Sequence, residues 1–307
     1  MYDIIPDIHG QVGKLKGTLK SLGYTESNGA WRNSDPSRTC VFLGDFIDRG
    51  PANGEVINIV RRMVDSGTAY AVMGNHELNA IHFHTRDPES GDALRKHSEK
   101  NIRQHASFLR EFPLGNSKTS EAISWMQNLP LFMEFETFRV VHACWNDTVI
   151  DKLVKVTKGG RLTDEQFISA ADQSSDLFSL VETTTKGPEA KLPEGYIIYD
   201  KEGNGRAEVR LQWWNESAST WKDIAISVPN PDQLPDGNLP VSVKQSVYPK
   251  KSKPVFFGHY WFSGQSVLQA QNALCLDYSA GRDGPLVSYQ FDPTSTLLSL
   301  KYLTVHS

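Results

Sequence analysis

Short apolar runs alternate with amphipathic segments over the first 80 residues. The apolar runs occupy residues 2–6, 39–43 and 69–73, and each has the length of a buried strand. Apolar residues recur at helical spacing between them, first at Val12, Leu15, Leu19 and Leu22, then at Val56, Ile59, Val60 and Met63. The order strand, helix, strand, helix, strand is typical of a largely parallel sheet in an α/β fold.

The remaining pattern is clear at both ends of the chain and weak between them. It predicts a polar helix over 93–112, strands at 131–135 and 138–141, a helix at 163–173, paired strands at 208–214 and 223–228, and strands at 255–257, 266–270, 273–277, 285–291 and 297–302. We expect the C-terminal strands to form a meander that closes a second sheet. We also expect a single domain over residues 1–307, with residues 146–254 as an insertion or cap.

Polar clusters follow the predicted strands at the points where the apolar runs end. The clusters are Asp7-Ile8-His9-Gly10, Gly44-Asp45-Phe46-Ile47-Asp48-Arg49-Gly50 and Gly74-Asn75-His76-Glu77, and later strands end at His142 and at Gly258-His259. The carboxyl ends of parallel strands meet at one edge of a sheet, so these clusters should converge. Carboxylate, imidazole and amide groups suit a site for two cations about 3.5 to 4 Å apart, for which Asp45 is a candidate bridge.

The ordered motifs PDIHG, GDFIDRG, GNHE, a strand-end His and a later GH resemble the calcineurin-like metallophosphoesterases, in particular their phosphoprotein phosphatase branch. The resemblance is close over residues 2–82. The C-terminal run CLDYSAGRDGPLVSYQF is similar to that of bacterial relatives, which include dinucleoside tetraphosphatases and Ser/Thr phosphatases. The resemblance implies a four-layer α/β/β/α sandwich of two mixed sheets, with a binuclear metal site at the strand ends.

The same resemblance implies a role for each motif residue. Asp7, His9 and Asp45 would bind a first divalent metal ion, and Asp45, Asn75, His142 and His259 a second; Mn²⁺ is favoured, with Fe, Zn²⁺ or Mg²⁺ as alternatives. A metal-bridging hydroxide would attack phosphorus in line. Arg49, Asn75 and His76 would bind the substrate, and His76, oriented by Asp48, would protonate the leaving oxygen.

Three departures from the family pattern affect this interpretation. Pro6 replaces the usual glycine before the first Asp, and Ala143-Cys144 follows the third His where the protein phosphatases commonly have two glycines. The sequence also offers no clear match for a second phosphate-binding arginine. The substrate therefore stays open among phosphoproteins, dinucleoside polyphosphates, and small phosphomonoesters or cyclic nucleotides.

Several residues near the motifs have a structural alternative. Asp48 and Arg49 could form an ion pair, Cys144 is more typical of a core residue than of a reactive thiol, and Trp213, Trp214 and Trp221 favour packing over an aromatic platform for a ligand. We expect His82 and His84 to lie near the site without binding metal. His97 and His105, spaced along a polar helix, are expected to face solvent.

The composition of the chain argues against some classes of binding partner. The 307 residues carry a formal net charge of −4 and no basic block, which disfavours a stable nucleic-acid partner. Three scattered cysteines indicate reduced thiols, and no apolar run approaches the roughly 20 residues of a membrane span. We therefore expect a cytoplasmic location, and the resemblance implies an enzyme that acts on a phosphorylated small molecule, nucleotide or protein. The alternative is a non-catalytic metal-binding interaction module, which should have lost His76 or several ligands.

Overall fold

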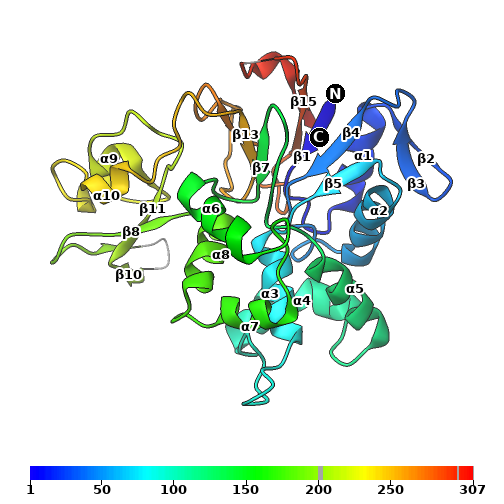
Figure 1. Ribbon diagram of the computed structural model, residues 1–307, viewed down its shortest axis with the longest axis horizontal. Helices are drawn as coiled ribbons and strands as arrows, with labels where there is room; N and C mark the ends of the chain where they lie inside the picture. The colour runs from blue at the N-terminus through cyan, green and yellow to red at the C-terminus, as the bar shows by residue number, and fades with distance from the viewer. Residues whose placement is uncertain (200–202, 296, 307) are drawn as a thin grey trace.

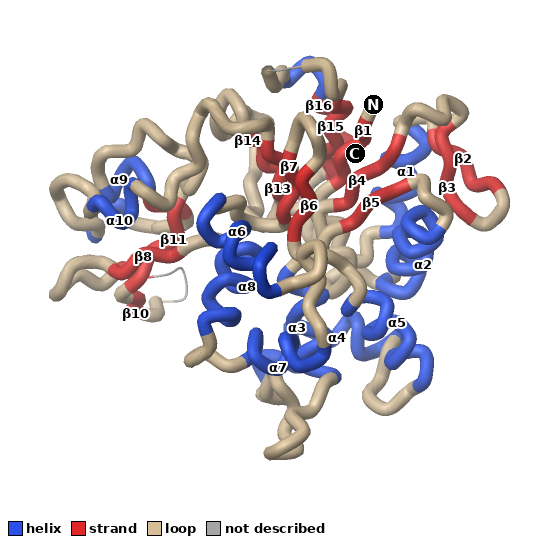
Figure 2. Tube along the Cα trace, in the orientation of Figure 1, coloured by secondary structure: helices blue, strands red, loops and turns tan. Residues whose placement is uncertain are grey.

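Two sheets form the centre of the molecule in the computed structural model, which describes residues 1–199, 203–295 and 297–306 (Figures 1 and 2). The first sheet has the order β16-β15-β1-β4-β5. Its strands are β1 (Tyr2–Ile5), β4 (Thr39–Phe42), β5 (Ala69–Ala71), β15 (Leu286–Phe291) and β16 (Leu303–His306). Strands β1, β4 and β5 are parallel, whereas β15 runs antiparallel to both of its neighbours.

The second sheet has the order β14-β13-β7-β6. Its strands are β6 (Phe132–Glu134), β7 (Arg139–Val141), β13 (Val255–Phe257) and β14 (Ala273–Cys275). Strands β7, β13 and β14 are parallel, and β6 pairs with β7 as an antiparallel hairpin. Both sheets are therefore mixed, and the parallel strands of each leave loops at their carboxyl ends.

Alternation along the strands divides the interior into two clusters. Val41 and Phe256, from different sheets, belong to one buried cluster, which therefore lies between the sheets. Their neighbours Phe42 and Phe257 belong to the other cluster, which also contains apolar residues of the surrounding helices. Successive side chains of a strand point to opposite faces, so each strand contributes to both clusters.

Several of the helices begin at a side chain that caps their first turn. They are α1 (Val12–Ser21), α2 (Asn53–Asp65), α3 (Asn75–His84), α4 (Glu99–Glu111), α5 (Ser117–Gln127), α6 (Asp147–Val156), α7 (Asp164–Ala171), α8 (Asp176–Lys186), α9 (Trp221–Ile224) and α10 (Val241–Lys244). The side chains of Ser98, Asn116 and Asn146 accept hydrogen bonds from the first turns of α4, α5 and α6. These bonds satisfy amide groups that have no partner inside a helix.

The segment between β7 and β13 carries α6 to α10 and several short strands, and it extends beside the second sheet (Figure 1). The short strands are β8 (Glu189–Lys191), β9 (Ile198–Tyr199), β10 (Gly205–Arg206), β11 (Glu208–Leu211) and β12 (Ala225–Ile226), and β2 (Tyr24–Ser27) pairs with β3 (Ala30–Asn33) elsewhere in the chain. Part of the segment has its own small buried cluster, which includes Val209, Trp221 and Ile224. Trp213 and Trp214 are buried against Phe257, so the prediction that they pack is confirmed.

The C-terminal meander was predicted wrongly. Residues 266–268 have no regular structure, and the chain near residue 300 forms a 3-10 turn (Leu300–Tyr302). The strands predicted at 266–270 and 297–302 are therefore not formed. Strand β14 joins the second sheet, but β15 and β16 extend the first sheet beside β1. An apolar run in the sequence predicts a buried strand, but it does not predict which other strand will pair with that strand.

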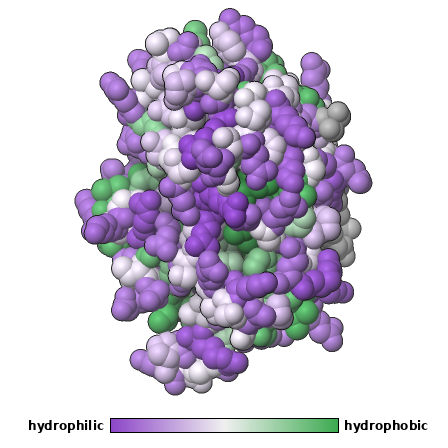
Figure 3. Space-filling view, turned by 90° about the vertical axis from the view of Figure 1, so that its right-hand side faces the viewer, coloured by the Kyte–Doolittle hydropathy of each residue, from purple (hydrophilic) through white to green (hydrophobic). Residues whose placement is uncertain are grey.

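Hydrophilic side chains cover most of the face in Figure 3, where hydrophobic ones gather in small groups. Over the part of the chain that the structure describes, no helix has the length and apolar character needed to span a bilayer.

Candidate active site

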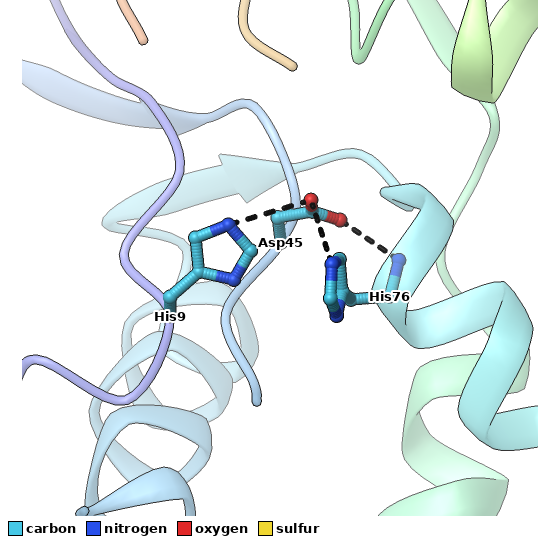
Figure 4. Close-up of side chains that lie close together, drawn as sticks. All are labelled: His9, Asp45 and His76. Atoms are coloured by element: carbon cyan, nitrogen blue, oxygen red, sulfur yellow. Dashed lines mark hydrogen bonds and ion pairs between the residues drawn. The ribbon is translucent and has the colours of Figure 1, made fainter. Parts of the chain in front are cut away.

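Asp45 lies at the centre of a buried cluster at the carboxyl ends of the strands. It follows β4, whereas Asp7 and His9 follow β1. Its Oδ2 atom lies 3.7 Å from Nε2 of His9 (Figure 4). That nitrogen is 4.0 Å from Oδ2 of Asp7. All three side chains are almost completely excluded from solvent. The structure therefore brings the first predicted ligand set together.

The second predicted ligand set lies around the same carboxylate, and two of its members follow strands of the other sheet. Nε2 of His142, which follows β7, lies 3.4 Å from Oδ2 of Asp45. Oδ1 of Asn75 lies 3.1 Å from that same imidazole nitrogen and 2.8 Å from Nδ1 of His259, which follows β13. Asp45 is thus shared between the two groups, as a bridging ligand would be.

The backbone is strained where it presents these groups. His9, Asp45 and His259 have φ values of 49°, 52° and 75°, a region that costs a non-glycine residue about 1 to 3 kcal/mol. Such conformations persist only where the surrounding structure enforces them. Here Glu77, which sequence reasoning left without a role, accepts hydrogen bonds from the backbone N–H groups of Gly74, Asp45 and Phe46. It was visible in the sequence as the last residue of GNHE.

His76 is the second residue of helix α3 and faces two carboxylates. Its Nδ1 atom lies 2.6 Å from Oδ2 of Asp48, and its Nε2 atom lies 4.0 Å from Oδ2 of Asp45. Its backbone N–H also donates to Oδ1 of Asp45 over 2.9 Å (Figure 4). Burial opposes a charged imidazole, but Asp45 and Asp48 outweigh it and raise the pKa of His76. A protonated ring held in this way is suited to donate a proton.

The prediction that His105 faces solvent is wrong. The residue is 5% exposed, and its Nδ1 atom lies 2.8 Å from Oδ1 of Asp48, whose other oxygen contacts His76. The ring stacks on Phe108, one turn along α4. The spacing of His105, Phe108 and Phe112 marks the buried side of that helix, and this is the signal that could have identified it. His97 is exposed, as expected.

His84 extends the chain of imidazoles beyond His105. Its Nε2 atom lies 3.3 Å from Nε2 of His105, and burial together with that neighbour lowers the pKa of His84 to about 4. His82 and His84 occupy the last turn of α3, near the site but outside both groups of potential ligands, as predicted.

Arg49 is held by an aromatic face rather than by Asp48. Its guanidinium carbon lies 3.8 Å from the ring centroid of Trp261, and that of Arg282 lies 5.2 Å from the same centroid. Such stacking stabilises a cation while leaving its N–H donors available. Lys14 supports the loop that carries Arg282, because its Nζ donates to the carbonyl groups of residues 280, 282 and 284 over 2.8 to 3.0 Å. Neither Trp261 nor Arg282 was identified from the sequence.

Burial and charge act against each other in the cluster. Burial raises the pKa of Asp7, and the neighbouring carboxylate Asp277 raises it further. Burial would do the same to Asp45, but His142 and His76 hold the pKa of Asp45 well below its ordinary value. Asp45 in turn raises the pKa of His142 to about 10 against the effect of burial, whereas burial and the nearby charge of His76 lower the pKa of His9 to about 3. Closely packed buried carboxylates of this kind require a compensating positive charge.

The donor set fits a pair of cations. Nε2 of His9 and Nε2 of His259 are buried, and neither has a hydrogen-bond partner within the described part of the chain. Among the residues that the structure describes, two groups have ligand atoms within 4.8 Å of one another, namely His9, Asp45 and His76, and Asp45, His142 and His259. Asp7 falls outside these two groups but borders the first through His9. Buried imidazole nitrogens without partners are costly unless a metal ion or other group satisfies them.

The cluster opens into a cleft of about 990 Å³. Asp48, Asn75, His76 and His259 line it together with Arg49 and Arg282. Cys144 is fully buried and burial raises its pKa, which confirms it as a core residue. Buried carboxylates and imidazoles beside an open cleft form a candidate metal site at the ends of the strands, where α/β proteins commonly bind their ligands.

Comparison with known proteins identifies the family. Residues 2–260 match the family of calcineurin-like phosphoesterases, and the chain belongs to that family. It is 31% identical over 159 residues to the asymmetrical bis(5'-nucleosyl)-tetraphosphatase PrpE of Oceanobacillus iheyensis, which is 51% of this chain and 61% of that relative. The protein of the same name from Bacillus subtilis is 43% identical over 75 residues, which is 24% of this chain and 30% of the relative. The chain thus aligns with less than two thirds of either relative.

Solved structures that resemble the chain include two phosphatases. The cold-active protein-tyrosine phosphatase of a psychrophilic Shewanella is 18% identical, with a TM-score of 0.49 over 97% of this chain and 80% of that one. A serine/threonine phosphatase from Saccharomyces cerevisiae is 12% identical, with a TM-score of 0.47 over 99% and 78% of the two chains.

Proposed function

We propose that this protein is a metal-dependent phosphoester hydrolase whose substrate is a phosphomonoester, a phosphoprotein or a dinucleoside polyphosphate. One observation carries the proposal: Asp45 is shared by two groups of buried ligand atoms directly below a cationic cleft. Family membership supports the same reaction class. The names of the tetraphosphatase relatives support the dinucleoside polyphosphate.

Two divalent cations would occupy the cluster, with Mn²⁺ favoured and Fe, Zn²⁺ or Mg²⁺ as alternatives. The proposed ligands are Asp7, His9 and Asp45 for one ion, and Asp45, Asn75, His142 and His259 for the other. Bound cations of this kind supply a hydroxide for in-line attack at neutral pH and neutralise charge on the phosphoryl group. The unpartnered nitrogens of His9 and His259 support this assignment.

The surrounding residues would bind and orient the phosphate. Arg49, fixed by Trp261, has N–H donors in a fork that matches two phosphate oxygens. His76 would donate a proton to the leaving oxygen from Nε2, because Asp48 occupies its Nδ1 side and favours the protonated ring. Asp48 would thereby fix the orientation of His76 without contacting the substrate.

The wider architecture is part of the proposal. Two mixed sheets with a shared cluster between them and helices on their outer faces are consistent with a four-layer α/β/β/α sandwich. Residues 146–254 would act as a cap within a single domain, since Lys186, Arg206 and Arg210 of this segment line the cleft. Deletion of the cap should change the substrate profile more than the affinity for metal.

An Mn²⁺-supplemented activity panel tests the function. It compares an aryl phosphate, a phosphopeptide, diadenosine tetraphosphate and a cyclic nucleotide, with His76→Asn as the control. Turnover of one natural substrate that falls about 100-fold or more in the variant supports both the reaction class and the proton donor. Binding of Mn²⁺ without turnover of any substrate would contradict the proposal and favour a non-catalytic metal-binding module.

A further inference from the structure

The cleft above the cluster concentrates positive charge on a chain that is negative overall. Nineteen of the residues that the structure describes line it; nine of them are arginine or lysine, and one, Asp48, carries a carboxylate. The formal net charge of the whole chain is −4. Asp48 is already engaged by His76 and His105, so it offers little compensation to the cationic walls. The cleft is therefore built to attract anions.

One side of helix α4 forms a wall of this cleft. Lys100, Arg103, Ser107 and Arg110 follow one another by three, four and three residues, so they lie on the same side of the helix, and all four line the cleft. Across the described ranges of the chain, Lys100, Arg103 and Arg110 form no ion pair. These cations are exposed, and their charges are available to a ligand.

Ser107 adds a neutral donor to the same wall. The residue is 7% exposed, and its buried hydroxyl has no hydrogen-bond partner among the residues that the structure describes. A buried hydroxyl without a partner is unfavourable, and a ligand oxygen would satisfy it. The wall therefore combines two flanking guanidinium groups with an unsatisfied hydroxyl between them.

A second part of the lining comes from the segment 146–254, through Lys186, Arg206 and Arg210. Lys186 at the end of α8 is paired with Glu182, and Arg210 of β11 lies 3.6 Å from Glu189. Nε of Arg210 is nevertheless buried and has no partner among the described residues. Arg210 and His259 line the same cleft, so this part of the lining reaches the proposed metal ligands. Together, the two parts of the lining carry more cationic groups than one phosphate group needs.

The residues that line the cleft do not provide a binding site for a nucleobase or for an apolar side chain. Within the described residues, the lining contains no phenylalanine, tyrosine or tryptophan, and Ala106 is its one aliphatic residue. Nucleobases are commonly held by stacking on aromatic rings, and peptides by apolar pockets. This cleft offers neither, so the phosphates themselves are the groups that it recognises.

We propose that the cleft binds a linear phosphoanhydride chain of three or more phosphates, with α4 holding the phosphates beyond the one at the metal cluster. This inference rests on the proposed function for the position of the reacting phosphate. It assigns the recognition of the chain to Arg103, Ser107 and Arg110 and requires no nucleoside. Inorganic polyphosphate and nucleoside polyphosphates share this chemistry.

Calorimetric titration of the full-length, chelator-treated protein with inorganic tripolyphosphate tests the proposal directly, because no metal is present for the ligand to sequester. Tripolyphosphate should bind about 100-fold more tightly than orthophosphate at low salt, since it contacts several cations at once. Adenosine triphosphate separates the two sources of the chain. Affinity equal to that of tripolyphosphate supports recognition of phosphates alone, whereas much tighter binding would overturn the claim that no nucleoside is required.

Paired variants locate the site. Arg103→Gln with Arg110→Gln should weaken tripolyphosphate binding about tenfold or more and flatten its salt dependence. Lys152→Gln with Lys155→Gln removes the same charge from the exposed surface of α6, outside the cleft, and should change binding less than about twofold. Equal effects of the two pairs would overturn the proposal, as would tighter binding of oligothymidylate than of tripolyphosphate.

Failure of this inference is distinguishable from failure of the proposed function. Turnover of aryl phosphate by the Mn²⁺-loaded protein, together with tripolyphosphate binding no tighter than orthophosphate, refutes the phosphate-chain site alone. Absence of turnover in the presence of bound Mn²⁺ refutes the hydrolase, whatever the titration shows.

Discussion

His105 and His76 share one carboxylate, that of Asp48. Nδ1 of His105 lies 2.8 Å from Oδ1, and Nδ1 of His76 lies 2.6 Å from Oδ2. The carboxylate is almost fully buried, so it has few alternative partners. Burial favours the neutral carboxyl, but the hydrogen bonds from both rings lower the pKa of Asp48 to about 2. His105 thus fixes the orientation and the charge of the group that positions the proposed proton donor.

Replacement of His105 by Phe should slow the hydrolysis of substrates with poor leaving groups. Phe keeps the stacking on Phe108 but removes the hydrogen bond to Asp48. We expect kcat to fall about tenfold for an alkyl phosphate and little for an activated aryl phosphate, because only the former needs full proton donation. The measurement is kcat for both substrates.

His105→Asn is the matched variant, since its amide retains a donor near the position of Nδ1. It should restore part of the activity on the alkyl phosphate. A purely structural role for His105 would instead lower both activities equally, with no recovery in His105→Asn.

Local sequence predicted the residues that follow a strand directly. Asp7, Asp45 and His142 each come within a few residues of a buried apolar run, so the strand ends alone place them at one edge. His105 lies on a helix that reads as mostly polar, and its partner Asp48 is 57 residues away. The role of His105 depends on how α4 packs beside the site, and the spacing of polar residues does not predict that packing.

The pairing of strands that are far apart in the sequence could not be predicted from local patterns either. The apolar run that forms β15 was recognised as a strand, but β15 pairs with β1 at the other end of the chain. Trp261 illustrates a further limit, because its φ of 54° is unusual for a bulky residue and carries no local sequence signal. That backbone turn brings the Trp261 ring against Arg49.

Replacement of Arg38 by Ala should destabilise the fold strongly. Asp3 in β1 is fully buried, and it accepts hydrogen bonds from both Arg38 and the hydroxyl of Tyr24. Loss of the guanidinium leaves a buried carboxylate with one partner, so the free energy of unfolding should fall by about 3 to 5 kcal/mol in urea denaturation.

Arg61→Ala is the comparison for an exposed ion pair. Its guanidinium lies 2.8 Å from Glu121 and 3.6 Å from Asp65, but all three side chains are at least one third exposed. Solvent screens such pairs, and we expect a loss of less than about 1 kcal/mol. Similar losses in the two variants would disprove the idea that burial gives the Asp3 pair its importance.

Gly74→Ala should weaken metal binding. A Cβ at this position would overlap Oδ1 and the backbone nitrogen of Asp45, neither of which is free to move. Displacing the shared ligand should raise the Kd for Mn²⁺ about 10- to 100-fold, as measured by titration calorimetry.

Gly17→Ala is the corresponding control in helix α1. A Cβ there meets no atom within 4 Å, and the residue is exposed. Alanine is favoured over glycine in a helix interior, so the free energy of unfolding should rise by about 0.5 to 1 kcal/mol with no change in Mn²⁺ affinity. An unaltered Kd in Gly74→Ala would mean that the backbone approach at Gly74 does not position Asp45.

Mn²⁺ should stabilise the fold through Asp45. The buried carboxylates Asp7 and Asp277 repel one another, and a cation beside them relieves this repulsion. At a free concentration 100 times its Kd, Mn²⁺ should raise the free energy of unfolding by about 2.7 kcal/mol, measured by urea denaturation with and without the ion. Asp45→Asn removes the charge shared by both ligand groups and should abolish most of this increase. Because each protein is compared with itself, the test does not depend on the intrinsic stability of the variant. An equal increase in wild type and Asp45→Asn would place the stabilising metal elsewhere on the molecule.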